Sequence, residues 1–230
     1  MLSSADLFLS VFDAFATSGG FAVLCIVWPE GAPRSENGLV AGGINVPHPG
    51  ETVSGDGWSI GTTGGATRIV MSDGLGHGAA AADASALAME AFRRTIDRPP
   101  VDALHGIHET LRATRGAAVA IADVDRDRGL VRFAGLGNIA GTIVTGETTR
   151  SVVSQHGTAG YDVRRLQEFT YPWQRDSMLV LHSDGLTSRW TLDRYPGLIA
   201  RHPMLIAGVL YRDFKRGRDD ASAVVLREAA

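Results

Sequence analysis

Five aspartates have the positions in this sequence that are best suited to chemistry. They are Asp56 in VSGDGWSI, Asp73 in IVMSDGLGHG, Asp184 in LVLHSDGL, and Asp219 and Asp220 in RDDASAVV. Each adjoins an apolar run that predicts a β-strand. Carboxylates gathered at strand ends form an all-oxygen ligand set, which suits Mg²⁺ or Mn²⁺, whereas zinc sites usually contain Cys or His. Two such ions could polarise a phosphoryl group and deprotonate a bridging water for in-line attack.

The most informative stretch is residues 69–92, where an apolar run ends in Asp73 and a glycine-rich turn leads into an alanine-rich segment. Gly74, Gly76 and Gly78 permit close approach of the backbone to a ligand. Taken alone, the turn also fits a phosphate cradle at a helix N-terminus, as in dinucleotide-binding folds. The carboxylate would repel a pyrophosphate, however, and no strand-end acid follows about 20 residues later. For any single aspartate, a turn residue that bonds its own backbone remains the simpler interpretation.

Length and composition narrow the class of protein. A chain of 230 residues is long enough for one substantial core, and its net charge of −3 argues against non-specific nucleic-acid binding. No apolar run approaches the roughly 20 residues that span a bilayer. The first residues also lack the basic stretch of a signal peptide. We therefore expect a cytoplasmic protein that binds neither nucleic acid nor membrane.

The order of predicted elements indicates the fold class. A helix is predicted over residues 4–16, a strand over 21–27, short β-like runs over 39–69, helices over 79–95 and 101–113, strands over 117–124, 130–135, 139–144, 178–182 and 221–226, and a helix near 203–214. Strands, then a helix pair, then strands again predict an α+β layered sandwich rather than a parallel βαβ sheet. The polar residues 154–165 are predicted to form a mobile loop beside the site.

Four motifs together carry a family resemblance. SGDGW (54–58), SDGLGHG (72–78), HSDGL (182–186) and RDDAS (218–222), in this order and spacing, resemble the PPM-type, protein phosphatase 2C-like, metal-dependent serine/threonine phosphatases. The SpoIIE/RsbX-like branch is the most similar, over residues 38–228. The resemblance implies a four-layer α-β-β-α sandwich, with two central antiparallel sheets flanked by helices. It also implies two Mn²⁺ or Mg²⁺ ions and hydrolysis of phosphoserine or phosphothreonine by a metal-bridging hydroxide. The substrate would be a phosphorylated regulatory partner in stress-response or sigma-factor signalling, with STAS-domain proteins as candidates.

The same resemblance implies which residues bind the ions, all of them through oxygen. Asp73 would bridge both metals, the Gly74 carbonyl would bind one of them, Asp56 would serve the first metal and Asp184 the second, and Asp219 would be the last ligand, with Asp220 beside it as a further candidate. The segment 135–138 (GLGN) is expected to support the site without binding metal.

Two features of this sequence differ from parts of the family. Animal and plant relatives place a histidine directly after Asp-Gly, where it can protonate the leaving oxygen, but here that position is Leu75 and the histidine is His77. A role for His77 is left open, and a third metal site is unsupported. The alternative to an enzyme is an inactive pseudophosphatase that acts as a binding module in signalling. The intact aspartates Asp56, Asp73 and Asp184 argue against that alternative.

The N-terminal segment has a resemblance of its own. Residues 6–29 look like the last helix and strand of a GHKL-type anti-sigma-factor kinase domain, which precedes an RsbX-like phosphatase in some bacterial proteins. Residues 1–29 are therefore expected to be a helix-strand remnant of such a domain. They contain none of its nucleotide-binding motifs.

Overall fold

The structure is a computed structural model that describes residues 7–17, 20–29, 37–161, 163 and 165–229, with side chains from residue 37 onward. Its strands are β1 (Leu7–Thr17), β2 (Gly20–Pro29), β3 (Leu39–Val46), β4 (Asp56–Thr63), β5 (Ala66–Gly74), β6 (Ala117–Asp125), β7 (Leu130–Leu136), β8 (Ala140–Thr145), β9 (Thr148–Val152), β10 (Phe169–Pro172), β11 (Ser177–His182) and β12 (Ala221–Glu228). Its helices are α1 (Ala79–Arg94), α2 (Pro100–Leu111) and α3 (Pro203–Phe214), with a 3₁₀ turn at Leu198–Ala200.

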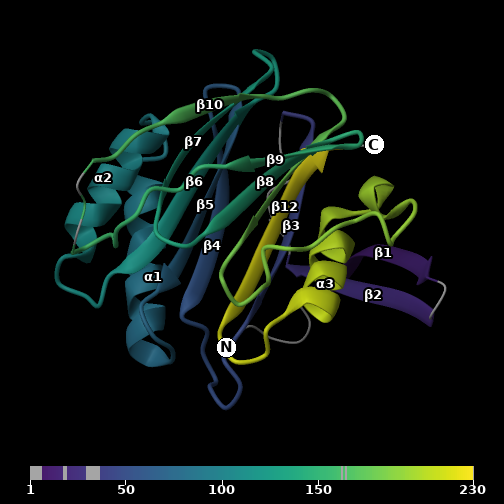
Figure 1. The fold of residues 1–230 in the computed structure, drawn as a ribbon, viewed down its shortest axis with the longest axis horizontal. Helices are drawn as coiled ribbons and strands as arrows, with labels where there is room; N and C mark the ends of the chain where they lie inside the picture. The colour runs from purple at the N-terminus through teal and green to yellow at the C-terminus, as the bar shows by residue number, and fades with distance from the viewer. Residues whose placement is uncertain (1–6, 18–19, 30–36, 162, 164, 230) are drawn as a thin grey trace.

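Two antiparallel sheets lie face to face, with helices on their outer faces (Figure 1). The first sheet has the strand order β10-β7-β6-β5-β4, and the second has the order β3-β12-β11-β8-β9. Helices α1 and α2 cover the first sheet, and α3 covers the second. The predicted α+β sandwich with an α-β-β-α layer order is therefore confirmed. Because β5 pairs antiparallel with both neighbours, the parallel dinucleotide-binding alternative is excluded.

Strand periodicity explains how two sheets make three apolar layers. In β5, Ile69 and Met71 point into the core between the sheets, whereas Val70 packs against α1 and α2. In β11, Leu179 belongs to the core between the sheets, and Val180 packs on the side of α3. Since successive side chains of a strand point to opposite faces, a continuous apolar run fits a strand that is covered on both sides.

Helix α1 packs closely on the first sheet because its buried face is made mostly of alanine. Ala81, Ala84 and Ala88 are fully buried, and Phe92 anchors the far end. This placement fixes the glycine-rich turn that precedes the helix.

The N-terminal segment differs from its prediction. Residues 7–17 form strand β1 in an antiparallel pair with β2, so the predicted helix over residues 4–16 is wrong for the part that the structure describes. Phenylalanine recurs in residues 7–17, and aromatic residues favour strands when an adjacent partner strand is available. The pair lies beside α3 (Figure 1). Residues 1–6 and 18–19 lie outside the described residues. The GHKL likeness now rests on β2 alone and stays a prediction.

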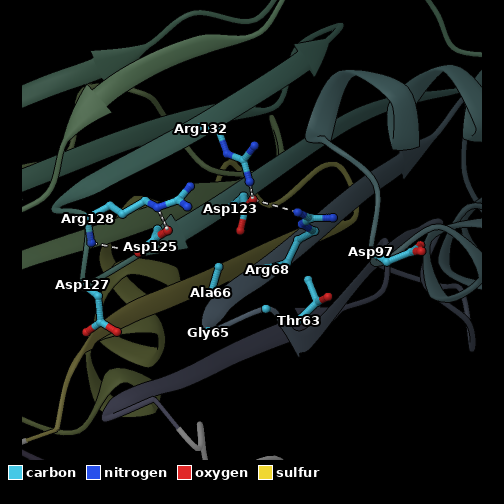
Figure 2. Close-up of a pocket in the computed structure, with 11 residues that line it drawn as sticks. Thr63, Gly65, Ala66, Arg68, Asp97, Asp123, Asp125, Asp127, Arg128 and Arg132 are labelled. Atoms are coloured by element: carbon cyan, nitrogen blue, oxygen red, sulfur yellow. Dashed lines mark hydrogen bonds and ion pairs between the residues drawn. The ribbon is translucent and has the colours of Figure 1, made fainter.

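A buried ionic network fixes the end of β5 that lies away from Asp73. Figure 2 shows Arg68 and Arg132 converging on the Asp123 carboxylate, and the Arg68 Nη2–Asp123 Oδ2 distance is 2.7 Å. Arg68 Nη1 also donates to the backbone carbonyls of Ile96 and Arg98, in the connection between α1 and α2. This network therefore ties β5 to the connection that follows α1.

No helix among the described residues is long and apolar enough to cross a membrane.

Candidate metal centre

The first sheet contributes two facing carboxylates. Asp56 is the first residue of β4, Asp73 is the penultimate residue of β5, and the two are direct partners in the antiparallel register. Opposed residues in such a pair have Cβ atoms about 5 Å apart on the same face of the sheet. The structure thus brings together two aspartates that are 17 positions apart in the sequence.

The second sheet contributes the remaining acids. Asp184 follows β11 directly after Ser183, and Asp219 and Asp220 immediately precede β12. Asp220 is buried, and its Oδ1 accepts a hydrogen bond of 2.8 Å from the backbone N–H of His48. Asp184 Oδ2 accepts a hydrogen bond of 2.8 Å from the side-chain amide of Asn138. All five predicted aspartates therefore reach the same end of the sandwich.

Burial and mutual repulsion perturb the two carboxyls of the first sheet. Burial raises the pKa of Asp56 from 3.8 to about 7; the Ser183 hydroxyl opposes this rise, and the charge of Asp220 adds to it. Burial raises the pKa of Asp73 to about 8, with the charges of Asp56 and Asp184 as the next causes. Carboxyls whose negative charges oppose one another favour a bound proton or a bound cation.

Unpartnered oxygens test whether these residues fit a divalent cation. Both carboxylate oxygens of Asp56, and Oδ2 of Asp220, are buried with no hydrogen-bond partner among the described residues. Ser183 and Ser222 lie near enough to Asp56 for their hydroxyls to lower its pKa, but neither reaches its carboxylate oxygens with the geometry of a full hydrogen bond. Buried carboxylate oxygens are costly unless they are paired or coordinate a metal. The donor set fits Mg²⁺ or Mn²⁺, which prefer oxygen ligands.

The carboxylates do not form a finished cage as they stand. No group of three or more His, Cys, Asp or Glu side chains within the described part of the chain is close enough to hold a metal ion. Within the described residues, the aspartates thus share one end of the sandwich without forming a preassembled metal site.

Glycines beside the aspartates are explained by close packing. A Cβ on Gly74 would lie 2.2 Å from the carbonyl oxygen of Ala81 in α1, and a Cβ on Gly185 would lie 1.9 Å from the backbone carbonyl oxygen of Asp220. A Cβ on Gly55 would lie 2.8 Å from Oδ2 of Asp220. The Asp-Gly pairs thus allow chain segments from both sheets to approach one another at the site.

A pocket of about 270 Å³ opens onto this end of the sandwich. Its lining residues include three of the aspartates together with polar, basic and apolar side chains: His48, Asp73, Leu75, Gly76, His77, Ala118, Asn138, Asp184, Arg218 and Asp219. Arg218 can attract a phosphoryl group, since a guanidinium matches phosphate oxygens in a bidentate geometry. The pocket therefore combines three carboxylates with the guanidinium of Arg218.

Sequence reasoning missed two residues that line this pocket, His48 and Arg218, and one residue beside it, Glu51. His48 stacks on His77, and Glu51 binds the His77 ring. The only sequence signal for His48 and Glu51 was their place in a loop that follows a predicted strand. Asn138 lies in the GLGN segment, which was expected to support the site, and it does contact Asp184.

Comparisons with known proteins establish the family. The sequence profile described as Stage II sporulation protein E (SpoIIE) matches residues 63–228. The chain belongs to the SpoIIE family. No curated protein matches the SpoIIE-family chain in sequence.

Solved structures resemble this SpoIIE-family chain over most of its length. A chain from the bacterial stressosome, described as a modular system adapted to control secondary messenger signalling, is 26% identical with a TM-score of 0.76, and the match covers 82% of this chain and 99% of that one. RsbX in complex with magnesium is 16% identical with a TM-score of 0.71, covering 86% and 98%. The PP2C phosphatase domain of SpoIIE from Bacillus subtilis, with a fragment of its regulatory domain, is 20% identical with a TM-score of 0.68, covering 94% and 70%.

These findings confirm the PPM-type, SpoIIE/RsbX-like resemblance that the sequence motifs indicated. The two likenesses at 16% and 20% identity bear on the fold, and family membership supports protein phosphatase activity.

Proposed function

We propose that this chain is a metal-dependent protein serine/threonine phosphatase that uses Mn²⁺ or Mg²⁺. The observation that supports this most directly is the burial of Asp56 and Asp220 with unpartnered carboxylate oxygens. Asp56 pairs with Asp73, and Asp220 follows Asp219, and both Asp73 and Asp219 line the pocket. Asp56, Asp73, Asp184, Asp219, Asp220 and the Gly74 carbonyl are the proposed ligands. Two bound ions would stabilise charge on the phosphoryl group and ease removal of a proton from the attacking water.

The residues of the chain have separate tasks in this proposal. Asp56 and Asp73 would be ionised when a cation is bound, and their charge would act strongly on it because the site is buried. Asn138 orients Asp184 through its side-chain amide. Arg218 is proposed to bind the phosphoryl oxygens at the edge of the pocket. Such positioning and electrostatic stabilisation provide most of the catalysis in phosphoryl transfer.

The substrate is proposed to be a phosphorylated regulatory protein rather than a small phosphoester. Leu75 lines the pocket and is 46% exposed, and Tyr161 is 66% exposed. Both lie beside Gly116: the Leu75 N–H donates to its carbonyl, and the Tyr161 ring contacts the position of a Gly116 Cβ. Exposed apolar side chains next to a polar pocket suit a polypeptide surface. The likeness to RsbX and to a stressosome chain favours a partner in stress or sigma-factor signalling, for which STAS-domain proteins are candidates.

The decisive experiment measures release of phosphate from a phosphoserine protein and from p-nitrophenyl phosphate, with Mn²⁺ and with EDTA. We expect turnover that depends on the metal and is lost in Asp73→Asn, while that variant stays folded by circular dichroism. Turnover that is equal with Mn²⁺ and with EDTA, or an Asp73→Asn variant as active as the wild type, would refute the proposal. Metal binding without turnover of any phosphoprotein would instead support the pseudophosphatase alternative.

A further inference from the structure

A group of exposed side chains borders the aspartate pocket where β6 begins. The Leu75 N–H donates to the Gly116 carbonyl over 3.0 Å, which joins the glycine-rich turn to the residues that precede β6. Arg115 Nη1 lies 3.2 Å from where a Cβ on Gly76 would be, and Gly76 lines the pocket. Cδ2 of Tyr161 lies 2.9 Å from the position of a Gly116 Cβ. We refer to Leu75, Arg115 and Tyr161 as the pocket flank.

The charge of Arg115 has no partner within the described part of the protein. Its side chain is exposed, and its guanidinium makes no ion pair or hydrogen bond with any residue that the structure describes. Arg112, by contrast, pairs with Glu109 over 3.1 Å. Arg115 also differs from Arg218, which lines the pocket itself. A free guanidinium next to the pocket, but outside its lining, can bind a carboxylate that lies beside the phosphoryl group.

The apolar part of the pocket flank is exposed and held in place. Leu75 and Tyr161 are two of the four large apolar side chains that are exposed among the described residues, at 46% and 66%. The Tyr161 hydroxyl donates to the Thr114 carbonyl over 3.2 Å, and two backbone hydrogen bonds join Ala159 to Ala117 at the start of β6. Two such side chains at one edge of a polar pocket offer a contact for an apolar side chain of a partner.

We propose, on the basis of the phosphatase function above, that the pocket flank selects the residues beside the phosphoserine. Arg115 binds an acidic side chain of the substrate, and Leu75 and Tyr161 contact an apolar one. An extended peptide advances about 3.3–3.6 Å per residue, so the residues one or two positions from the phosphoserine cover about 7 Å on each side of it. With the phosphoryl group in the pocket, these neighbours are the ones that meet a surface bordering the pocket. The preferred substrate is therefore a phosphorylated segment with acidic and apolar neighbours, and basic neighbours disfavour it.

The test compares phosphoserine peptides that carry glutamate, alanine or lysine at the two positions on each side of the phosphoserine. With Mn²⁺ at low salt, we expect wild-type kcat/KM to be about fivefold or more higher for the glutamate peptide than for the lysine peptide, since an exposed ion pair gives a modest gain and like charges a similar loss. Arg115→Gln should lower this ratio to about 1, and Arg115→Glu should reverse it. Raising the salt from about 0.05 M to about 0.5 M should shrink the wild-type ratio, because salt screens exposed charges.

The apolar contact has a measurement of its own. Leu75→Ser should lower kcat/KM severalfold for a peptide with leucine beside the phosphoserine, because an apolar contact is lost. The fall should be smaller for the same peptide with serine in that position. An equal fall for the two peptides would overturn the apolar part of the proposal.

Arg93→Glu is the matched control, because Arg93 is exposed in the last turn of α1, about 20 Å along the helix from the glycine-rich turn. It makes the same change of charge and should keep the wild-type ratio. A wild type that does not discriminate between the glutamate and lysine peptides would overturn the proposal, and so would an Arg115→Glu variant that keeps the wild-type ratio. Absence of metal-stimulated turnover of every peptide would instead count against the phosphatase function itself, and fluorescence anisotropy with the same peptides would then test the pocket flank separately.

Discussion

Replacing Asp56 with Asn should stabilise the metal-free protein while it removes a proposed metal ligand. Asp56 is 4% exposed, and its pKa rises from 3.8 to about 7 on folding. At about 1.4 kcal/mol per unit, ionised Asp56 lowers the free energy of unfolding by about 4 kcal/mol at pH 8. A buried amide without partners costs about 1–3 kcal/mol, so the net gain for Asp56→Asn is about 2 kcal/mol. For a chain of this length, that gain raises Tm by about 4–8 °C.

The raised pKa of Asp56 also predicts how the free energy of unfolding changes with pH. A carboxyl whose pKa is raised in the folded state contributes stability that is present below pH 3.8 and is lost as the pH rises through about 7. The wild type in EDTA should therefore become less stable between pH 4 and pH 8. The advantage of Asp56→Asn should be largest at pH 8 and mostly absent at pH 5. With Mn²⁺ at about 100 times its Kd, the wild type gains about 2.7 kcal/mol and the order of the two proteins reverses.

The test measures Tm of the wild type and of Asp56→Asn by circular dichroism under four conditions: pH 5 and pH 8, each with EDTA and with Mn²⁺. Asp127→Asn is the control, because Asp127 is exposed at the β6–β7 turn and should change Tm little under any condition. If Asp56→Asn melted at or below the wild type in EDTA at pH 8, burial and the neighbouring charges would not destabilise ionised Asp56. The electrostatic reasoning for the metal centre would then be wrong.

Three further substitutions test other features. Arg68→Met leaves Asp123 buried with fewer partners and should lower the free energy of unfolding in urea by about 3–5 kcal/mol, most of which the double variant with Asp123→Leu recovers. Gly185→Ala places a Cβ 1.9 Å from a backbone oxygen, so we expect about 1–3 kcal/mol of destabilisation and loss of Mn²⁺ binding in calorimetry; normal binding would contradict the packing argument. Asn138→Ala removes the hydrogen bond to Asp184 and should weaken Mn²⁺ affinity about tenfold, with an unchanged Kd as the contrary result.

Much of the fold could be predicted because its strands are long apolar runs between glycine-rich turns. The helices over residues 79–94, 100–111 and 203–214, and most strands of the two sheets, lie close to their predicted bounds, whereas the edge strands β9 and β10 were not predicted. Residues 7–17 were predicted wrongly, since their apolar residues fit a helical period and a strand alike. A partner strand decides between the two periods, and local spacing does not reveal that partner.

The aspartates of the site could be found in the sequence because each stands beside a glycine or a strand boundary. Pairing of Asp56 with Asp73 follows from a hairpin, which a sequence can indicate. Contacts that cross between distant segments could not be predicted in this way. The Arg68–Asp123 pair joins residues 55 positions apart, and the Glu51–His77 pair joins residues 26 positions apart. Both pairs depend on how the sheets and α1 pack.

The aspartates come from both halves of the sandwich, two from the first sheet and three from the second. Neither sheet alone therefore carries all five aspartates. The distances between the acids of the two sheets depend on how one sheet is aligned on the other. A slide of about 1 Å along the interface would alter every distance across the site, and catalysis is sensitive to displacements of that size. Substitutions deep in the layer between the sheets, such as at Met71 or Leu181, could thus change catalysis without touching the pocket.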